Sequence, residues 1–184
     1  DAQVDGIELQ PEFAALGLEN IHLNDLGSRV RCLRGDVLGL PTEANIYDQV
    51  MMNPPYLVDG GNDTGMDAAK RIATIEGPAR LDDWVHAAGS ALRPGGGLTI
   101  IHRADRLGDI LASATANDFG SLTVFPLWPK SGVAAHRMIV HGRKANGGRL
   151  ALASGLVLHQ ANGAYTPEAD AALRGASLDF APHS

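Results

Sequence analysis

The sequence has few of the residues that mark disulfide-stabilised, membrane-spanning or metal-binding proteins. Its 184 residues include one cysteine, Cys32, so no internal disulfide can form, and a reducing cytoplasm is the expected location. No apolar run reaches the roughly 18 residues of a membrane span, and there is no signal-peptide pattern. The seven histidines show no metal-ligand spacing with Cys32 or with one another, so no metal site is expected.

What the chain does contain is an alternation of apolar, strand-like runs with helix-like segments, together with 22 glycines that suit tight turns. This pattern is typical of an α/β domain with a mostly parallel sheet and helices on both faces. The length suits one substantial core, so we expect a single domain over residues 1–184. Strands are predicted at 4–9, 30–33, 47–52, 98–102, 122–128 and 137–143, and helices at 11–24, 67–75, 81–92 and 105–117.

Helix and hairpin signals refine two of these boundaries. Asp105 is expected to cap the helix over 105–117. Near the carboxyl end a hairpin is predicted between 156–158 and 165–166, because Asn162-Gly163 is a favoured two-residue turn. Thr166 followed by Pro167 then predicts a short helix with Thr166 as its cap.

The most informative run is Asn53-Pro54-Pro55-Tyr56, which directly follows the predicted strand 47–52. Proline lacks an N–H and disfavours a helical conformation in the residue before it, so the run is expected to leave the strand extended. The Asn53 side-chain oxygen and the Pro54 carbonyl can then accept both hydrogens of one amino group, and Tyr56 offers a ring for stacking. Such acceptors stabilise the positive charge of an attacking amine. An ordinary turn is the alternative, although ligands of open α/β sheets bind at this strand end.

This run also carries a family resemblance. Asp48-x-x-x-Met52-Asn53-Pro54-Pro55-Tyr56 resembles the signature of S-adenosylmethionine-dependent amino methyltransferases, which methylate exocyclic nitrogens of adenine, cytosine or glutamine. Residues 4–9 look like the second strand of their Rossmann-like fold, 34–37 like the turn after the third, and 92–97 like the segment that leads into the fifth. The resemblance implies a class I methyltransferase fold, S-adenosylmethionine as cofactor, and Asn53, Pro54, Pro55 and Tyr56 as the catalytic residues.

The same resemblance assigns cofactor contacts. Glu8, followed by Leu9, ends a predicted strand where a carboxylate can accept hydrogen bonds from both ribose hydroxyls. Asp36, followed by Val37, would accept from the adenine amino group, and Asn53 would also contact the cofactor. The alternatives are a solvated carboxylate for Glu8 and a turn or cap residue for Asp36.

One expected part of this fold is missing from the sequence. A nucleotide-binding fold places a glycine-rich loop after its first strand, and no such strand, loop and helix precede residue 4. The run 95–97 is no substitute, because it precedes a predicted strand. Either the chain is a fragment without the amino-terminal strand and loop, which we favour, or part of the cofactor site has been lost.

Two further residues are kept outside the catalytic set. Asp48 is expected to orient its strand, since a neutral amine can attack a sulfonium methyl without a general base. His102 ends a predicted strand and is interpreted as a hydrogen-bonding surface residue, outside the catalytic set.

Charge is distributed unevenly along the chain. Residues 1–66 carry eleven acidic and three basic side chains, a net charge of −8. Residues 130–150 carry no acidic side chain and five basic ones: Lys130, Arg137, Arg143, Lys144 and Arg149. Beside the Asn53 pocket such a segment could hold phosphates, and the alternative is a solvated strand edge.

Four later runs narrow the resemblance. They look like the bacterial branch of tRNA(Val) adenine-N6 methyltransferases, and they cover 101–107, 126–130, 140–144 and 158–169. This implies tRNA as the partner and an unstacked adenine of the anticodon loop as the substrate. Transfer to a protein glutamine, and a non-catalytic RNA-binding or partner subunit, remain alternatives. The sequence gives no indication of the oligomeric state.

Overall fold

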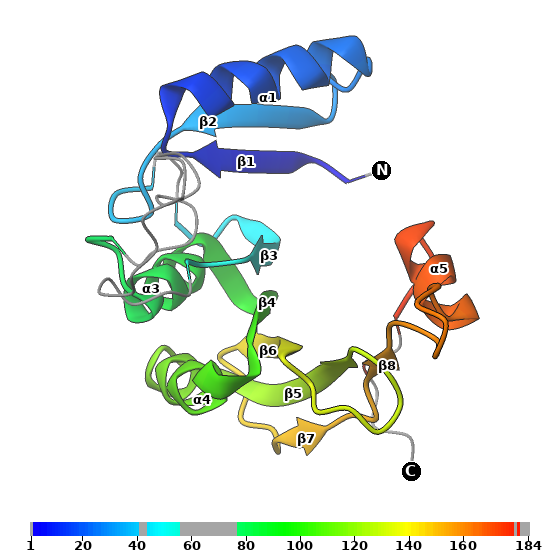
Figure 1. Ribbon diagram of the computed structural model, residues 1–184. Helices are drawn as coiled ribbons and strands as arrows, with labels where there is room; N and C mark the ends of the chain where they lie inside the picture. Colours follow the sequence, from blue (N-terminus) through cyan, green and yellow to red (C-terminus); the bar gives the residue numbers. More distant parts are fainter. Residues whose placement is uncertain (1, 41–43, 56–76, 179, 181–184) are drawn as a thin grey trace. The chain divides into compact units, whose positions relative to one another are not determined.

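A computed structural model describes residues 2–40, 44–55, 77–178 and 180 (Figure 1). The chain consists of two compact units, Asp1–Glu43 and Ala44–Ser184, which are described separately below. The predicted helix over 67–75 and the predicted site residue Tyr56 lie outside the described residues. No helix in the described part of the chain is long and apolar enough to cross a membrane.

The first unit is a strand, a helix and a second strand. β1 (Val4–Glu8) and β2 (Val30–Arg34) pair in parallel, and α1 (Pro11–Leu23) connects them (Figure 1). Asp5 lies opposite Arg31 in the register, and their side chains form an ion pair at 2.6 Å. The helix packs against β2 at Gly17, where a Cβ would lie 2.8 Å from the Cys32 sulfur. A glycine at this position therefore permits the contact between helix and sheet.

The second unit is built around one mixed sheet. β3 (Tyr47–Met52) pairs in parallel with β4 (Leu92–Arg103), while β6 (Arg137–Lys144) lies antiparallel between β4 and β5 (Phe119–Trp128). The strand order is β3-β4-β6-β5-β7, in which β7 is Ala151–Leu152, and β8 (Leu156–Val157) also pairs in parallel with β5. Because both β4 and β5 are antiparallel to β6, they run in the same direction as β3.

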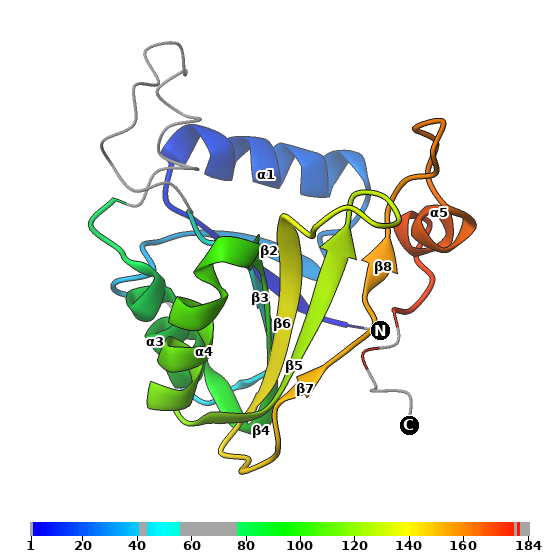
Figure 2. The same cartoon turned by 60° about the horizontal axis from the view of Figure 1, so that its bottom comes forward.

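Two helices cover one face of this sheet. α3 (Leu81–Ala91) and α4 (Leu107–Ala116) pack on the side that carries the buried side chains of β4 and β6 (Figure 2). Alternation along the strands sends Leu98, Ile100, Met138 and Val140 to this face. The cluster comprises Leu81, Val85, Ala88, Leu92, Leu98, Ile100, Ile110, Ala114, Phe119, Leu122, Val124, Met138 and Val140. These thirteen residues form the hydrophobic core of the unit.

The carboxyl end of the chain follows the sequence prediction. His159 and Tyr165 form an antiparallel bridge after β8, which confirms the predicted hairpin. Its turn is centred on Ala161-Asn162 and not on Asn162-Gly163, because the Gly163 N–H donates to the Gln160 carbonyl at 3.0 Å. α5 (Pro167–Leu173) begins as predicted, because the Thr166 hydroxyl accepts a hydrogen bond from the Ala169 N–H at 3.1 Å.

The strands and helices predicted within the described residues are present, but some starts differ: β4 begins at Leu92 instead of 98, β5 also begins earlier than predicted, and α4 begins later. Asp105 lies in a short 3-10 turn, η1 (Ala104–Arg106), and α4 begins only at Leu107 with no side-chain cap. The Asp105 carboxylate instead accepts hydrogen bonds from Arg103. An ion pair with a guanidinium two residues away has replaced the expected capping contact.

Candidate active site at the carboxyl edge of the sheet

The strands of the second unit end along one edge, which we call the carboxyl edge. Met52 lies opposite Ile100, so Asn53, just after β3, stands close to the level at which Arg103 ends β4. Arg137, at the start of β6, lies opposite Arg103 on one side and opposite Leu127, near the end of β5, on the other. Ligands of open α/β sheets bind outside this edge.

The Asn53-Pro54-Pro55 run leaves β3 without a helix or turn. Pro54 is among the fully buried side chains, Pro55 is half-buried and Asn53 is exposed. The Asn53 side chain forms no hydrogen bond with another described residue. A buried proline thus anchors the run, and the amide of Asn53 is left at the surface with both its acceptor and its donors available to a ligand.

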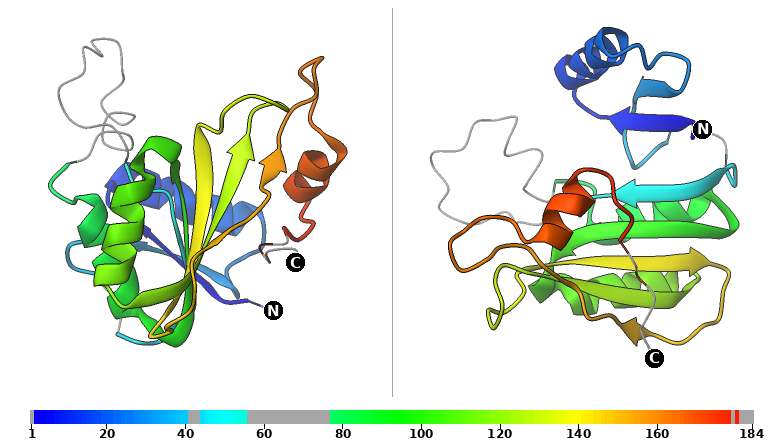
Figure 3. Two further views of the ribbon diagram at one scale, coloured as in Figure 1. Left: turned by 90° about the horizontal axis from the view of Figure 1, so that it is seen from below. Right: turned by 90° about the vertical axis from the view of Figure 1, so that its right-hand side faces the viewer.

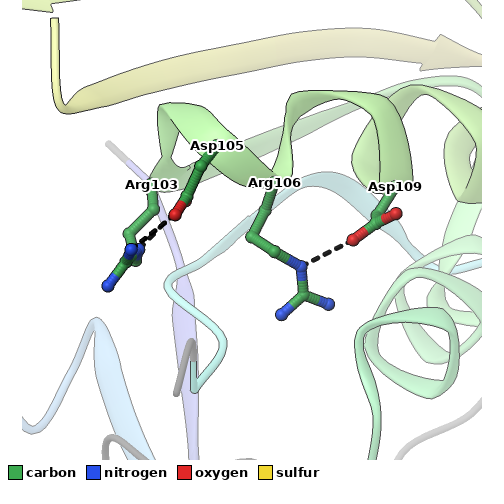
Figure 4. A network of polar contacts seen from close by, with 4 residues as sticks. All are labelled: Arg103, Asp105, Arg106 and Asp109. Atoms are coloured by element: carbon green, nitrogen blue, oxygen red, sulfur yellow. Dashed lines mark hydrogen bonds and ion pairs between the residues drawn. The ribbon is translucent and has the colours of Figure 1, made fainter. Parts of the chain in front are cut away.

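Two arginines lie at the end of β4 in a network of ion pairs (Figure 4). The Arg103 Nε donates to an Asp105 oxygen at 3.0 Å, and its Nη2 makes a second contact with the same carboxylate. The Arg106 Nε donates to Asp109 at 2.6 Å. Figure 4 shows both guanidinium groups projecting to the same side of η1. Each cation is therefore held in a defined direction by a carboxylate.

The ion pair with Arg103 also changes the pKa of Asp105. The hydrogen bond from Arg103 lowers the pKa of Asp105 below its ordinary value. Burial opposes this shift, and the nearby charges of Arg103 and Arg106 add to it. Asp105 therefore stays ionised to lower pH than an isolated carboxyl.

Arg103 and Arg106 were not among the predicted site residues. Their spacing, with acids two residues after Arg103 and three after Arg106, could have indicated the pairs.

His102 differs from its interpretation as a surface residue. Its side chain is 2 % exposed and lies on the helix-covered face with Ile100. The alternation of β4 is the cause, because every second residue from Leu98 onward points into the core.

Asp48 forms an ion pair with Arg93 at 2.6 Å, and both side chains are exposed. This contact links β3 to the start of β4, in keeping with the structural role expected of Asp48.

The basic segment 130–150 is divided between opposite edges of the sheet. Lys130 and Arg137 belong to the carboxyl edge, and both are exposed. Arg143 and Lys144 lie at the other end of β6, opposite Gly97 and Phe119. Phosphate binding beside Asn53 therefore remains possible only for the first part of the segment, because β6 carries its two ends to opposite edges.

A cavity of about 620 Å³ lies at that opposite edge. It is lined by α4, the start of β5 and the loop after β6, with Leu111, Phe119, Leu122, Asn146 and Leu150 among its residues. None of the predicted site residues lines it.

The predicted cofactor residues lie in the first unit. Glu8 ends β1, and its Oε1 accepts a hydrogen bond from the Gln10 N–H at 2.8 Å, while Leu9 is exposed. Asp36 follows β2, and its Oδ1 accepts from the Leu38 N–H at 3.0 Å. Because β1 and β2 are parallel and Glu8 lies opposite Arg34, both carboxylates stand at the same end of this two-stranded sheet.

Val37 is half-buried within the turn after β2. In the described part of the chain, no group of three or more histidine, cysteine, aspartate or glutamate side chains could hold a metal ion.

No family model matches the chain, but curated proteins resemble it. A protein of Tolumonas auensis named tRNA1(Val) (adenine(37)-N6)-methyltransferase is 31% identical over 114 residues, which are 62% of this chain and 46% of that protein. A protein of the same name from Porphyromonas gingivalis is 26% identical over 173 residues, 91% of this chain and 67% of that protein. The chain thus spans between about half and two thirds of these relatives.

A solved structure is similar to this chain over nearly its whole length. The predicted O-methyltransferase Atu636 from Agrobacterium tumefaciens is similar with a TM-score of 0.76 and 25% identity, over 95% of this chain and 78% of that one. Together with the parallel strand pairs, the antiparallel β6 and the helices on the sheet, this similarity shows that the chain has the Rossmann-like α/β fold of class I S-adenosylmethionine-dependent methyltransferases.

Proposed function

We propose that the protein transfers a methyl group from S-adenosylmethionine to the exocyclic N6 nitrogen of an adenine in tRNA. The observation that carries this proposal is the Asn53-Pro54-Pro55 run, which leaves β3 at the carboxyl edge with Pro54 buried and Asn53 exposed. The names of the two curated relatives support the choice of adenine and tRNA.

The proposed chemistry asks little of the protein beyond positioning. When bound, S-adenosylmethionine supplies an electrophilic methyl group. The Asn53 side-chain oxygen and the Pro54 carbonyl each accept a hydrogen bond from the adenine amino group. Together they orient its nitrogen toward that methyl group. Both acceptors stabilise the positive charge that develops on nitrogen in the transition state. The methylated nitrogen then releases one proton to water, so no general base is required.

The first unit would hold the cofactor. The Glu8 carboxylate would accept from ribose hydroxyls, and Asp36 would accept from the adenine amino group, with Leu9 and Val37 beside them. These two residues fit the cofactor, because both carboxylates stand at the same end of the β1–β2 sheet and can accept hydrogen bonds from its ribose hydroxyls and amino group. One oxygen of each already accepts a local N–H, which fixes its orientation.

A tRNA substrate suits this pocket for an energetic reason. An adenine in a single-stranded loop can leave its neighbours at low unstacking cost, whereas a base inside a duplex must first be unpaired. Tyr56, which completes the four-residue run, would stack on that base. A cytoplasmic location would accompany such a substrate.

Two linked measurements on the full-length protein test this proposal. Calorimetry with S-adenosylhomocysteine measures cofactor binding, and transfer of a radiolabelled methyl group from S-adenosylmethionine to tRNA(Val) transcripts measures the activity. We expect binding, and transfer that disappears when guanine replaces the anticodon-loop adenine. Binding with transfer only to a glutamine-containing peptide would overturn the substrate, and absence of cofactor binding would overturn the methyltransferase proposal itself.

A further inference from the structure

The hairpin between β8 and α5 stands at the carboxyl edge of the second unit. Val157 lies opposite Trp128, the last residue of β5, and β8 runs parallel to β5. The chain therefore continues past the edge in the direction in which Asn53 leaves β3. Figure 3, right, shows this hairpin on the side toward which the β3 arrow points, and Figure 2 shows it beyond the head of β5.

The hairpin has a defined shape. The Thr166 N–H donates to the Leu158 carbonyl at 3.0 Å, and the Gln160 N–H donates to the Ala164 carbonyl at 2.8 Å. The Gln160 side chain also donates to the Tyr165 carbonyl at 2.9 Å. Backbone and side-chain hydrogen bonds thus fix the segment before any ligand binds, which lowers the entropy cost of recognition.

Two aromatic rings stack on this hairpin. The centroids of His159 and Tyr165 are 4.8 Å apart, and their planes are inclined by 27°. His159 is half-buried, whereas Tyr165 is 49 % exposed. One face of the tyrosine ring therefore rests on the histidine, and much of the remainder is open to solvent. A cross-strand ring pair that only stabilises the hairpin would show the same contact.

Positive charge lies next to these rings. The Pro129 carbonyl accepts from the His159 N–H at 3.0 Å, which brings the following residue, Lys130, beside the hairpin. The Lys130 ammonium donates to the Ala161 carbonyl at 3.2 Å and remains exposed. Residues 158–166 contain no acidic side chain.

The nearest acids along the chain are Glu168 and Asp170 in α5. Asp170 pairs with Arg174 at 2.8 Å, so its charge is partly balanced within the helix. An exposed aromatic face beside an exposed ammonium is the combination that binds single-stranded nucleic acid, in which bases stack and phosphates pair with cations.

We propose that this hairpin is a second RNA contact, at which Tyr165, supported by His159, stacks on an unpaired base of the same tRNA loop and Lys130 binds a neighbouring phosphate. The inference rests on the proposed function. In the order β3-β4-β6-β5-β8 the hairpin lies four strand spacings from Asn53, roughly 19 Å at about 4.8 Å each. This separation requires a base several nucleotides away from the methylated adenine.

A fluorescent RNA tests the stacking directly. The probe is an anticodon stem-loop with 2-aminopurine at one unpaired position, each position in turn, added to the full-length protein. Stacking on a tyrosine should quench the fluorescence at one position other than the target. Tyr165→Leu should abolish that quenching and weaken binding about tenfold, the loss expected when one base no longer stacks on an aromatic ring. Tyr165→Phe should preserve both, since it retains the ring.

Further variants separate stacking from folding. Leucine, like phenylalanine, still covers His159, so a difference between the two variants reports the ring and not the fold. Lys130→Met should weaken binding and lower its salt dependence without removing the quenching. Leu152→Ala, at an exposed apolar residue of β7, is the matched control and should change neither quantity.

The outcomes distinguish this inference from the proposed function. Equal binding and quenching by Tyr165→Leu and the unaltered protein, with tRNA methylation intact, would overturn the hairpin contact alone. Absence of both methyl transfer and stem-loop binding in the unaltered protein would overturn the proposed function, and the hairpin contact with it.

Discussion

The two edges of the sheet in the second unit use their basic residues differently. At the carboxyl edge the side chain of Arg137 is exposed and forms no hydrogen bond or ion pair with another described residue. At the opposite edge the Lys144 ammonium donates to the Leu92 carbonyl at 2.7 Å and to the Asn45 side chain at 2.8 Å, and Arg143 donates to the Gly95 carbonyl at 3.1 Å. The Arg137 side chain is therefore available to a ligand, whereas Arg143 and Lys144 link parts of the fold.

The opposite edge is also closely packed. The loop after β6 lies so close to the start of β5 that a Cβ on Gly120 would be 1.6 Å from the Asn146 carbonyl oxygen. A Cβ on Gly148 would be 1.9 Å from the Ser121 hydroxyl. The comparison teaches that the surroundings decide the role of a cation. A half-buried cation with two acceptors, such as Lys144, stabilises the fold, whereas an exposed one, such as Arg137 or Lys130, still has N–H groups available for a ligand.

The largest expected effect is chemical and lies at the carboxyl edge. Asn53→Ala should lower the rate of methyl transfer by about 10²–10³-fold, because it removes an acceptor that acts mainly in the transition state. Affinity for S-adenosylhomocysteine should change little. Single-turnover assays measure the rate and calorimetry the affinity. Gln49→Ala, an exposed position on the same strand, is the control, and near-normal turnover of Asn53→Ala would refute the role.

The next effect concerns stability at the opposite edge. Lys144→Met should reduce the free energy of unfolding by about 1–3 kcal/mol, because the carbonyl of the buried Leu92 loses a charged donor. Urea denaturation measures this loss. Arg149→Ala, exposed and also basic, should leave the midpoint unchanged. An unchanged midpoint for Lys144→Met would mean that the two edges do not differ in this respect.

A smaller effect is expected for RNA binding at the carboxyl edge. Arg137→Ala should weaken tRNA binding and reduce the slope of log affinity against log salt by about one, as the loss of one phosphate contact predicts. Its unfolding midpoint should not change. Filter binding at several salt concentrations measures the slope, with Arg149→Ala again as the control. Equal slopes for the two variants would contradict a special role of the carboxyl edge.

The smallest expected effect is a dependence of the free energy of unfolding on pH, through His141 in β6. Burial, and then the charge of Arg143, lower the pKa of His141, whose Nδ1 lies 3.1 Å from the Thr99 hydroxyl and whose ring stacks near Phe180. Between the lowered folded pKa and the ordinary value near 6.5 the unfolded chain binds more protons, so stability should fall as the pH drops through this range.

Denaturation at about pH 7.5 and about pH 5 checks this sign. His141→Gln cannot titrate, and it should lose less stability between the two conditions than the unaltered protein. An equal loss in both proteins would assign the pH dependence to other groups.

Much of the local structure could be predicted because its causes are local. Thr166 and Pro167 specify the start of α5 through one hydroxyl and one fixed φ angle. The apolar run of β3 ends where Asn53 precedes two prolines, and the observed strand, Tyr47–Met52, has the same bounds as the predicted one. The prediction that Asp105 caps a helix was wrong. Its carboxylate could accept either from backbone N–H groups at the helix start or from the nearby Arg103, and it accepts from Arg103.

The candidate site was predictable in part for the same reason. The family resemblance indicated Asn53, Pro54, Glu8 and Asp36 from short runs, and the structure places Asn53 at a strand end with Pro54 buried. Their catalytic and cofactor roles stay predictions. The burial of His102 followed from strand alternation, a signal that was present in the sequence.

By itself the sequence determined the presence of the strands, the starts of α1, α3 and α5, and the extended exit from β3, since each depends on residues a few positions apart. Only the tertiary structure decided which basic residues share an edge with Asn53. That outcome depends on the insertion of β6, antiparallel, between β4 and β5. Pairing between strands far apart along the chain is set by long-range packing of the core, so the neighbourhood of Lys130 and Lys144 cannot be read from their spacing.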